Sequence, residues 1–187
     1  MTPVREQPVA AYLEALASTR AVPGGGSAAA LAAAMGAALV SMVAKLSARK
    51  AKTSEDRSAL DALVPLLDAL RDRFADLSQE DIEAYQQVVE ARKAGAPAAE
   101  IEQAYEGAAE VPLQTAEAVD ECLALAAKVS ARAWEMTASD LAVGSELLQT
   151  AMGGALGNVA INLPELHGDR ASRIERRYLR LRNRPQD

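Results

Sequence analysis

The sequence feature that most constrains the fold is an uncharged segment, residues 28–44, in which nine of 17 residues are alanine. Alanine has the highest intrinsic helix propensity, so the segment is predicted to be helical. Its residues are apolar on every side, and such a helix must be covered on all faces. Alanine is only marginally hydrophobic, and a PGGGS motif rather than an interfacial anchor precedes the segment. We therefore expect a buried central helix and no membrane partner.

The rest of the chain predicts an all-α fold. Aromatic residues make up 3% of the 187 residues, and no segment alternates with period two for long enough to form a strand. We expect a single domain, residues 1–187, built as a bundle of about five or six mostly antiparallel long helices that dimerises through long helices. The predicted helices cover about residues 9–17, 27–50, 54–94, 97–133, 139–163 and 170–181.

Particular residues are predicted to bend or begin these helices. Pro65 and Pro112 should bend the helices that contain them. Ser78 is expected to restart the first of these two helices. Ser27 and Ser139 have side chains suited to capping a helix amino terminus.

Charge is distributed unevenly along the chain. The net charge is −6. Residues 169–187 contain seven arginines and three acidic residues, giving +4, so residues 1–168 carry −10. The acidic body argues against a nucleic-acid partner. We expect the basic C-terminal helix, within residues 169–187, to dock on that body or to lie solvated; an anion or RNA contact is the alternative.

The sequence offers few residues that ligate metals or form disulfides. Cys122 is the single cysteine and His167 the single histidine, so a thiolate cluster, a zinc site or a Ser-His-Asp triad cannot form within one chain. Cys122 is expected in the core and His167 in a loop. The lone cysteine and the lack of a secretory pattern lead us to expect a cytoplasmic protein.

Three polar sites could carry chemistry. The first is the PGGGS loop at residues 23–27, whose glycines precede a helix amino terminus that favours a carboxylate or a polarised carbonyl. A structural turn explains such a loop equally well. The second is Asp81 with Tyr85, one helical turn apart, a possible general base and a phenol that orients it. Alternatively, Ser78 and Asp81 form a capping box at a helix start.

A third candidate lies near the C-terminal end of the body. Asp140 and Asn158 share a helix face but stand roughly 27 Å apart along the axis. Together with Asn162 they could line one site only if a two-fold partner brought the far end of its own helix alongside. Helix capping by Asp140 and core hydrogen bonding by the asparagines are the alternative.

These segments together resemble the cyclodeaminase/cyclohydrolase family, which comprises the carboxy-terminal domain of formiminotransferase-cyclodeaminase and the methenyltetrahydrofolate cyclohydrolases. The matching motifs occur in family order: PGGGSAAALAAAMGAALVSMVAKLSARK, DIEAYQQVVEA, VPLQTAEAV and SDLAVGSELLQTAMGGALGNVAINL. The resemblance implies an all-helical, dimeric fold with a folate substrate. It also implies a catalytic carboxylate at Asp81. The implied ligand-facing loop consists of Gly24, Gly25, Gly26 and Ser27. The further pocket residues that it implies are Lys50, Asp140, Asn158 and Asn162.

The resemblance leads to two hypotheses about function. The first is an enzyme that hydrolyses methenyltetrahydrofolate to formyltetrahydrofolate, or deaminates formiminotetrahydrofolate to methenyltetrahydrofolate, with Asp81 and Tyr85 as the catalytic pair. We expect no metal or redox cofactor. The second is a non-enzymatic helical dimer or small-ligand binder that has lost the folate site. Its basis is that the sequence departs from the family pattern at residues 94–96 and 133–134, and at Arg49 and Thr53.

Overall fold

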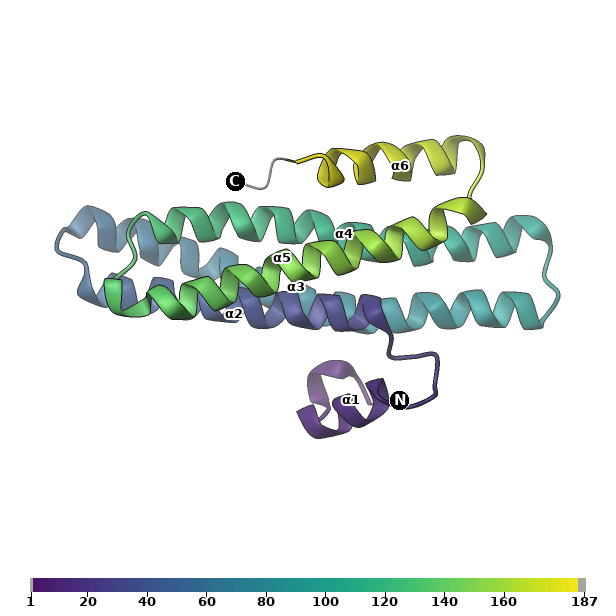
Figure 1. The fold of residues 1–187 in the computed structure, drawn as a ribbon, viewed down its shortest axis with the longest axis horizontal. Coiled ribbons are helices and arrows are strands. Elements are labelled where there is room, and N and C mark those ends of the chain that lie inside the picture. Colours follow the sequence, from purple (N-terminus) through teal and green to yellow (C-terminus); the bar gives the residue numbers. More distant parts are fainter. Residues whose placement is uncertain (1, 185–187) are drawn as a thin grey trace.

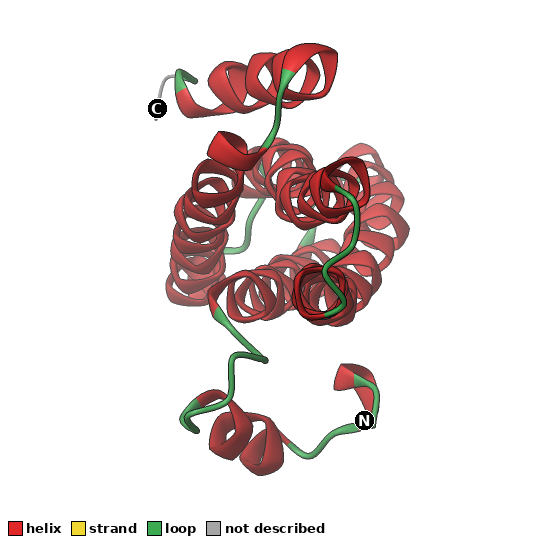
Figure 2. Ribbon diagram, turned by 90° about the vertical axis from the view of Figure 1, so that its right-hand side faces the viewer, coloured by secondary structure: helices red, strands yellow, loops and turns green. Residues whose placement is uncertain are grey.

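The computed structural model describes residues 2–184, which form an antiparallel bundle of four long helices. These are α2 (Gly25–Lys50), α3 (Ser54–Lys93), α4 (Ala98–Ser130) and α5 (Ala138–Asn162). Shorter elements are η1 (Val4–Glu6), α1 (Val9–Leu16), η2 (Glu135–Thr137), η3 (Leu163–Glu165) and α6 (Gly168–Arg182). Figure 1 shows the long helices side by side, and Figure 2 places α1 and α6 on opposite sides of the bundle. The described residues contain no strand, so the all-α prediction is confirmed.

Helix α2 packs against α3, α4 and α5 through its small side chains. Ala30, Ala33, Ala37 and Ala44 are fully buried along it. The contact with α5 is close at Gly36, where an added β-carbon would lie 2.8 Å from the carbonyl oxygen of Gly144. The alanine-rich sequence therefore allows α2 and α5 to approach until their backbones touch.

One stripe of α2 stays uncovered in the single chain. The helix is long and apolar enough to cross a membrane by composition, but 61% of its most apolar window is buried inside the bundle. Met35 is 51% exposed, and partly buried side chains flank it along the helix, namely Leu31, Ala32, Leu39, Met42 and Leu46. Within a single chain α2 is one of four bundle helices, so the predicted cover on every face is not provided by one copy.

Helix α3 is continuous for 40 residues, and this corrects the predicted restart at Ser78. The helix continues through Pro65, and Ser78 does not restart it. Ser78 is instead fully buried and donates to the backbone carbonyl of Ser27 at 2.9 Å. The capping-box interpretation of Ser78 and Asp81 is therefore wrong, since both residues lie deep within α3.

The predicted serine caps are also wrong. The N-cap of α2 is Gly24, which has no side chain, and that of α5 is Thr137, whose side chain makes no capping hydrogen bond. Ser27 lies within the first turn of α2, where other side-chain hydroxyls engage its own. Ser139 is exposed in the first turn of α5. Backbone amides at the start of α2 consequently remain available to other groups.

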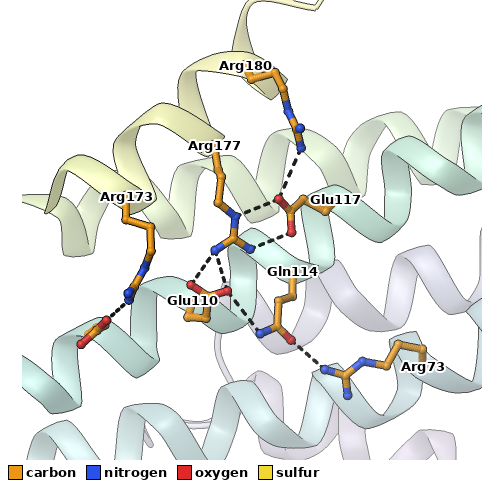
Figure 3. Close-up of polar contacts among 8 residues, drawn as sticks. Arg73, Glu110, Gln114, Glu117, Arg173, Arg177 and Arg180 are labelled. Carbon is orange, nitrogen blue, oxygen red and sulfur yellow. Dashed lines mark hydrogen bonds and ion pairs between the residues drawn. The ribbon is translucent and has the colours of Figure 1, made fainter. Parts of the chain in front are cut away.

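The basic helix α6 docks on α4, as predicted for the arginine-rich tail. Arg177 donates to Glu110 at 2.8 Å and to Glu117 at 2.7 Å, and Arg173 pairs with Glu106 (Figure 3). Ile174 and Tyr178 anchor the same face in an apolar cluster with residues of α4 and α5. Burial of apolar side chains fixes α6 in place and the ion pairs set its register.

Candidate active site

The site forms where the middle of α3 meets the amino terminus of α2. Asp81 packs its carboxylate against the backbone of Gly26, so that an added β-carbon there would lie 2.7 Å from Cγ and 2.8 Å from Oδ2. The backbone N–H of Ser27 donates a hydrogen bond to the carboxylate. Glycine at position 26 thus lets a carboxylate reach the start of a helix, where the amides and the helix dipole favour negative charge.

A chain of buried hydroxyl groups holds this junction together. Ser27 Oγ lies 3.0 Å from the hydroxyl of Tyr12 on α1 and 2.8 Å from Oγ of Ser78 on α3. All three side chains are buried. Sequence reasoning missed Tyr12 and Ser78 as parts of the site. The signal for Ser78 was a polar residue directly after Phe74 and Leu77 in a buried stripe, whereas nothing in the sequence singled out Tyr12.

The environment of Asp81 perturbs its acidity. Burial raises the pKa of this carboxyl from 3.8 to about 6, and the hydrogen bond from Ser27 opposes the rise. A group with a pKa near 6 is mostly ionised at neutral pH and can accept a proton and return it. Such a perturbed group beside open backbone amides is typical of a catalytic carboxylate.

Asn158 and Asn162 reach the same end of the bundle from α5. The Nδ2 atom of Asn158 would lie 3.5 Å from a β-carbon added at Gly25, which places this side chain beside the loop. Asn158 Nδ2 donates to the carbonyl oxygen of Gly154 at 2.8 Å. Asn162 Nδ2 donates to the carbonyl oxygens of Ala108 and Asn158, at 3.0 and 2.9 Å. The asparagines therefore tie α5 to itself and to α4 through their amide nitrogens.

Tyr85 lies one turn beyond Asp81 on α3 and is 43% exposed. Its phenol makes no side-chain hydrogen bond within residues 2–184, so it does not hold Asp81 directly. It lies near Tyr105 of α4, whose ring stacks under Arg92 at 5.0 Å. Tyr85, Tyr105 and Arg92 thus form a group farther along α3 and α4 from Asp81, and sequence reasoning did not single out the last two.

Lys50 and Asp140 lie at the opposite end of the bundle. Lys50 closes α2, about 37 Å along the helix axis from Gly25. Its ammonium lies 5.2 Å from the ring centroid of Trp134, close to the start of α5 where Asp140 sits. One chain therefore brings together the PGGGS loop, Asp81, Tyr85 and the asparagines, while Lys50 and Asp140 form a separate group.

Metal-ligating side chains do not gather in the described part of the chain. Residues 2–184 contain no group of three or more His, Cys, Asp or Glu placed to hold a metal ion. Cys122 is buried, as expected, and His167 is an exposed residue before α6.

Comparison with known proteins connects this arrangement to a family. The model of the formiminotransferase-cyclodeaminase family matches residues 8–177. A methenyltetrahydrofolate cyclohydrolase of Methylorubrum extorquens is 34% identical, over 88% of this chain and 83% of that protein. The formimidoyltransferase-cyclodeaminase of Gallus gallus is 31% identical over 86% of this chain, which spans only 31% of that relative.

A solved structure shows the same fold. The formiminotetrahydrofolate cyclodeaminase of Thermotoga maritima superposes with a TM-score of 0.83 over 96% of both chains, at 24% sequence identity. The family match covers most of the chain, and the similarity to the cyclohydrolase extends over 83% of that protein. This chain therefore belongs to the formiminotransferase-cyclodeaminase family.

Proposed function

We propose that this protein is a folate one-carbon enzyme that hydrolyses methenyltetrahydrofolate to formyltetrahydrofolate, with Asp81 as the general base. The observation that carries the proposal is the half-buried Asp81 carboxylate, seated against Gly26 at the amino terminus of α2. The similarity to a methenyltetrahydrofolate cyclohydrolase over 88% of the chain supports this substrate class.

The reaction needs one proton to be moved twice. The methenyl carbon lies between two nitrogens and is electron-poor, so water can attack it. Asp81 takes a proton from the attacking water, a bond forms between oxygen and carbon, and a tetrahedral adduct results. One carbon–nitrogen bond of the adduct then breaks as the carbon–oxygen double bond forms. Asp81 returns its proton to the departing nitrogen, and the proton of the adduct's hydroxyl leaves to solvent. The formyl group remains on the other nitrogen, with no change in oxidation state.

The start of α2 would stabilise the adduct. Its N-cap, Gly24, has no side chain to satisfy the first amides, and Ser27 already donates to Asp81. The N–H groups of Gly25 and Gly26 are therefore suited to the oxygen that develops negative charge. The exposed Tyr85 and the amide of Asn158 lie at the rim, where they would contact the ring system of the ligand.

Cyclodeamination of formiminotetrahydrofolate would use the same groups. In that reaction the second bridging nitrogen of the folate, which does not carry the formimino group, attacks the formimino carbon. Asp81 takes the proton from this nitrogen and passes it to the departing ammonia. The Gallus gallus relative is named for this activity and supports it as the second candidate. Ammonia release with the formimino substrate, measured beside methenyl hydrolysis, distinguishes the two.

We also propose that the active form is a homodimer. Helix α5 packs against α2 and exposes small and apolar residues of its own, which include Gly153, Gly157 and Ile161, the last being 73% exposed. Small and apolar side chains on two adjacent helices suit a self-complementary interface. Such pairing would complete the cover of α2 and could bring Lys50 and Asp140 of one copy to the Asp81 site of the other.

Two measurements test the proposal. Decay of the methenyl chromophore should be faster with the purified protein than in buffer, and Asp81→Asn should lose this activity while keeping its helical circular-dichroism spectrum. A decay rate with the parent protein equal to the rate in buffer contradicts the proposed reaction.

Light scattering tests the dimer. Met35→Glu should dissociate it, whereas the control Leu179→Glu, on the exposed surface of α6, should not. A monomeric parent contradicts the dimer.

A further inference from the structure

A cationic pocket lies at the turn between α2 and α3, far from Asp81 in the same chain. It has a volume of about 430 Å³ and is lined by Lys45, Ala48, Arg49, Arg57 and Asp61. Lys45 and Arg49 lie one turn apart on α2, and Arg57 faces them from the first turns of α3. The pocket thus collects three cationic side chains from two helices.

The positive charge here is concentrated in an acidic protein. Residues 45–57 contain five basic residues and two acidic ones, a net +3, in a chain of net charge −6. Lys45 is paired with Asp68. Neither Arg49 nor Arg57 forms an ion pair within residues 2–184, in contrast to Arg71, Arg132 and Arg177, which do. Two exposed guanidinium groups therefore share one pocket, and neither forms an ion pair with Asp61, the acidic residue of its lining.

A ligand with two carboxylates fits this arrangement. Guanidinium groups bind carboxylates through paired hydrogen bonds, and two of them at one pocket match a dianion. Asp61 is the one acidic residue lining the pocket and can accept a hydrogen bond from an amide of the same ligand. A folate ends in a glutamate, which presents two carboxylates next to an amide N–H.

We infer that the pocket lined by Arg49 and Arg57 binds the glutamate carboxylates of the folate substrate held at the Asp81 site of a second copy of the chain. The inference rests on the proposed function and on the proposed dimer. It assigns these two arginines to substrate binding, and it gives a role to a cationic pocket that lies far from the catalytic carboxylate of its own chain.

The distance along α2 requires the second copy. Arg49 lies about 36 Å along the helix axis from Gly25, and a folate is far too short to span that length. Arg49 lies on the same uncovered side of α2 as Met35 and Met42. If two copies pair their α2 helices antiparallel along this side, the Arg49 end of each helix lies beside the Gly25 end of the other.

Steady-state kinetics with two substrates test the inference. Replacing both arginines, Arg49→Gln with Arg57→Gln, should raise KM for the glutamate-containing methenyl substrate by about tenfold or more, with kcat nearly unchanged. A substrate analogue without the glutamate should show the high KM with both parent and variant. Arg176→Ala, an exposed arginine on α6 outside any ion pair of the described residues, serves as the control and should change neither value.

The outcomes separate the two proposals. An inactive parent overturns the proposed function, and this inference with it. An active parent with an unchanged KM in the double variant overturns the inference alone. The inference also fails if the double variant raises KM equally for the analogue that lacks glutamate. Inorganic phosphate and free glutamate should each compete with the glutamate-containing substrate in the parent and not in the variant; competition that survives in the variant places their binding elsewhere and also counts against the pocket.

Mixed dimers test the contribution of the second copy. Asp81→Asn chains and double arginine-variant chains are co-expressed with different tags, and the mixed species is purified. One site in each mixed dimer then combines an intact Asp81 with the intact arginines of the other copy. Half the parent activity at the parent KM is expected. Activity at the high KM only would show that each pocket serves its own chain and would overturn the inference.

Discussion

The carboxylate of Asp81 occupies the space that a side chain at residue 26 would need, so Gly26 and Asp81 fix each other's positions. This contact joins the start of α2 to the middle of α3 at the proposed catalytic base. A methyl group at residue 26 must displace either the carboxylate or the helix start. Displacements of this size matter because proton transfer depends on distances near hydrogen-bond length.

Gly26→Ala is therefore expected to lower methenyl hydrolysis by about a hundredfold while the protein stays folded. Gly107→Ala on α4 is the matched control, because an added β-carbon there meets nothing within 4 Å. The control should keep full activity and gain about 0.5–1 kcal/mol of stability from the better helix propensity of alanine. Full activity in Gly26→Ala would show that the carboxylate need not touch residue 26.

The raised pKa of Asp81 predicts the pH dependence of the reaction. The carboxyl must be ionised to accept a proton, so kcat/KM should fall as pH drops through about 6. A pH–rate profile from pH 4 to 9 measures this limb. An acid limb near pH 4, the range of an ordinary aspartate, would mean that the ionisation controlling the rate is not that of Asp81.

The same shift predicts that Asp81→Asn stabilises the fold while abolishing activity. Because the folded-state pKa lies above the unfolded value of 3.8, ionisation is harder in the folded state, and stability falls as pH rises from about 4 to 6. Asparagine avoids this cost and can still accept the hydrogen bond from Ser27. Urea denaturation at pH 8 should show a gain on the order of 1 kcal/mol that vanishes at pH 4, and Glu14→Gln, at an exposed position, should show neither.

The helices were predictable because apolar and alanine-rich stretches with helical spacing are long and strong in this sequence. The four long helices and the docked basic helix lie where the pattern placed them, within a few residues. The errors fell on serines. A serine before an apolar run indicates a cap when only its neighbours in sequence are considered, but Ser27 and Ser78 bond to each other across 51 positions of the chain.

The candidate site was predictable only in part, for a related reason. The glycine loop and Asp81 stand out locally, and the structure brings them together. The close approach of Gly25 to Asn158 depends on how α5 crosses α2, which no local pattern specifies. Tyr12 lies on a short helix whose docking is decided by tertiary contacts with Val4 and Ile82.

The hydroxyl chain predicts a cost for removing its member on α3. Ser78 donates to the backbone carbonyl of Ser27 and contacts the Ser27 hydroxyl, and the two residues are fully buried. Ser78→Ala should destabilise the protein by about 1–2 kcal/mol, because buried polar atoms of Ser27 lose a partner. Ser172→Ala on exposed α6 removes a local bond only and should change stability by less than about 0.5 kcal/mol. Thermal and urea denaturation measure both; equal values would show that the chain contributes no net stability.

Arg177 predicts how firmly the basic helix is held to the bundle. It bridges Glu110 and Glu117 while partly shielded from solvent, and the hydrogen bond from Arg177 lowers the pKa of Glu117 (Figure 3). Arg177→Met keeps the apolar stem but leaves two acidic side chains without this partner. We expect a loss of about 1–2 kcal/mol at pH 7 and low salt, after allowing for solvent screening. Arg176→Ala, outside any ion pair of the described residues, should cost less than about 0.5 kcal/mol.

The pH dependence separates this electrostatic contribution from simple packing. Because the folded pKa of Glu117 is depressed, its contribution is present above the unfolded value of 4.5 and is lost as pH falls through the folded pKa. The difference in unfolding free energy between the parent and Arg177→Met should therefore shrink as the pH is lowered below 4.5, and also shrink in 1 M salt at pH 7. If the difference in unfolding free energy is the same at pH 7 and low salt, below pH 4.5, and in 1 M salt, the ion pairs do not hold α6 on α4. The apolar contacts of Ile174 and Tyr178 would then hold it.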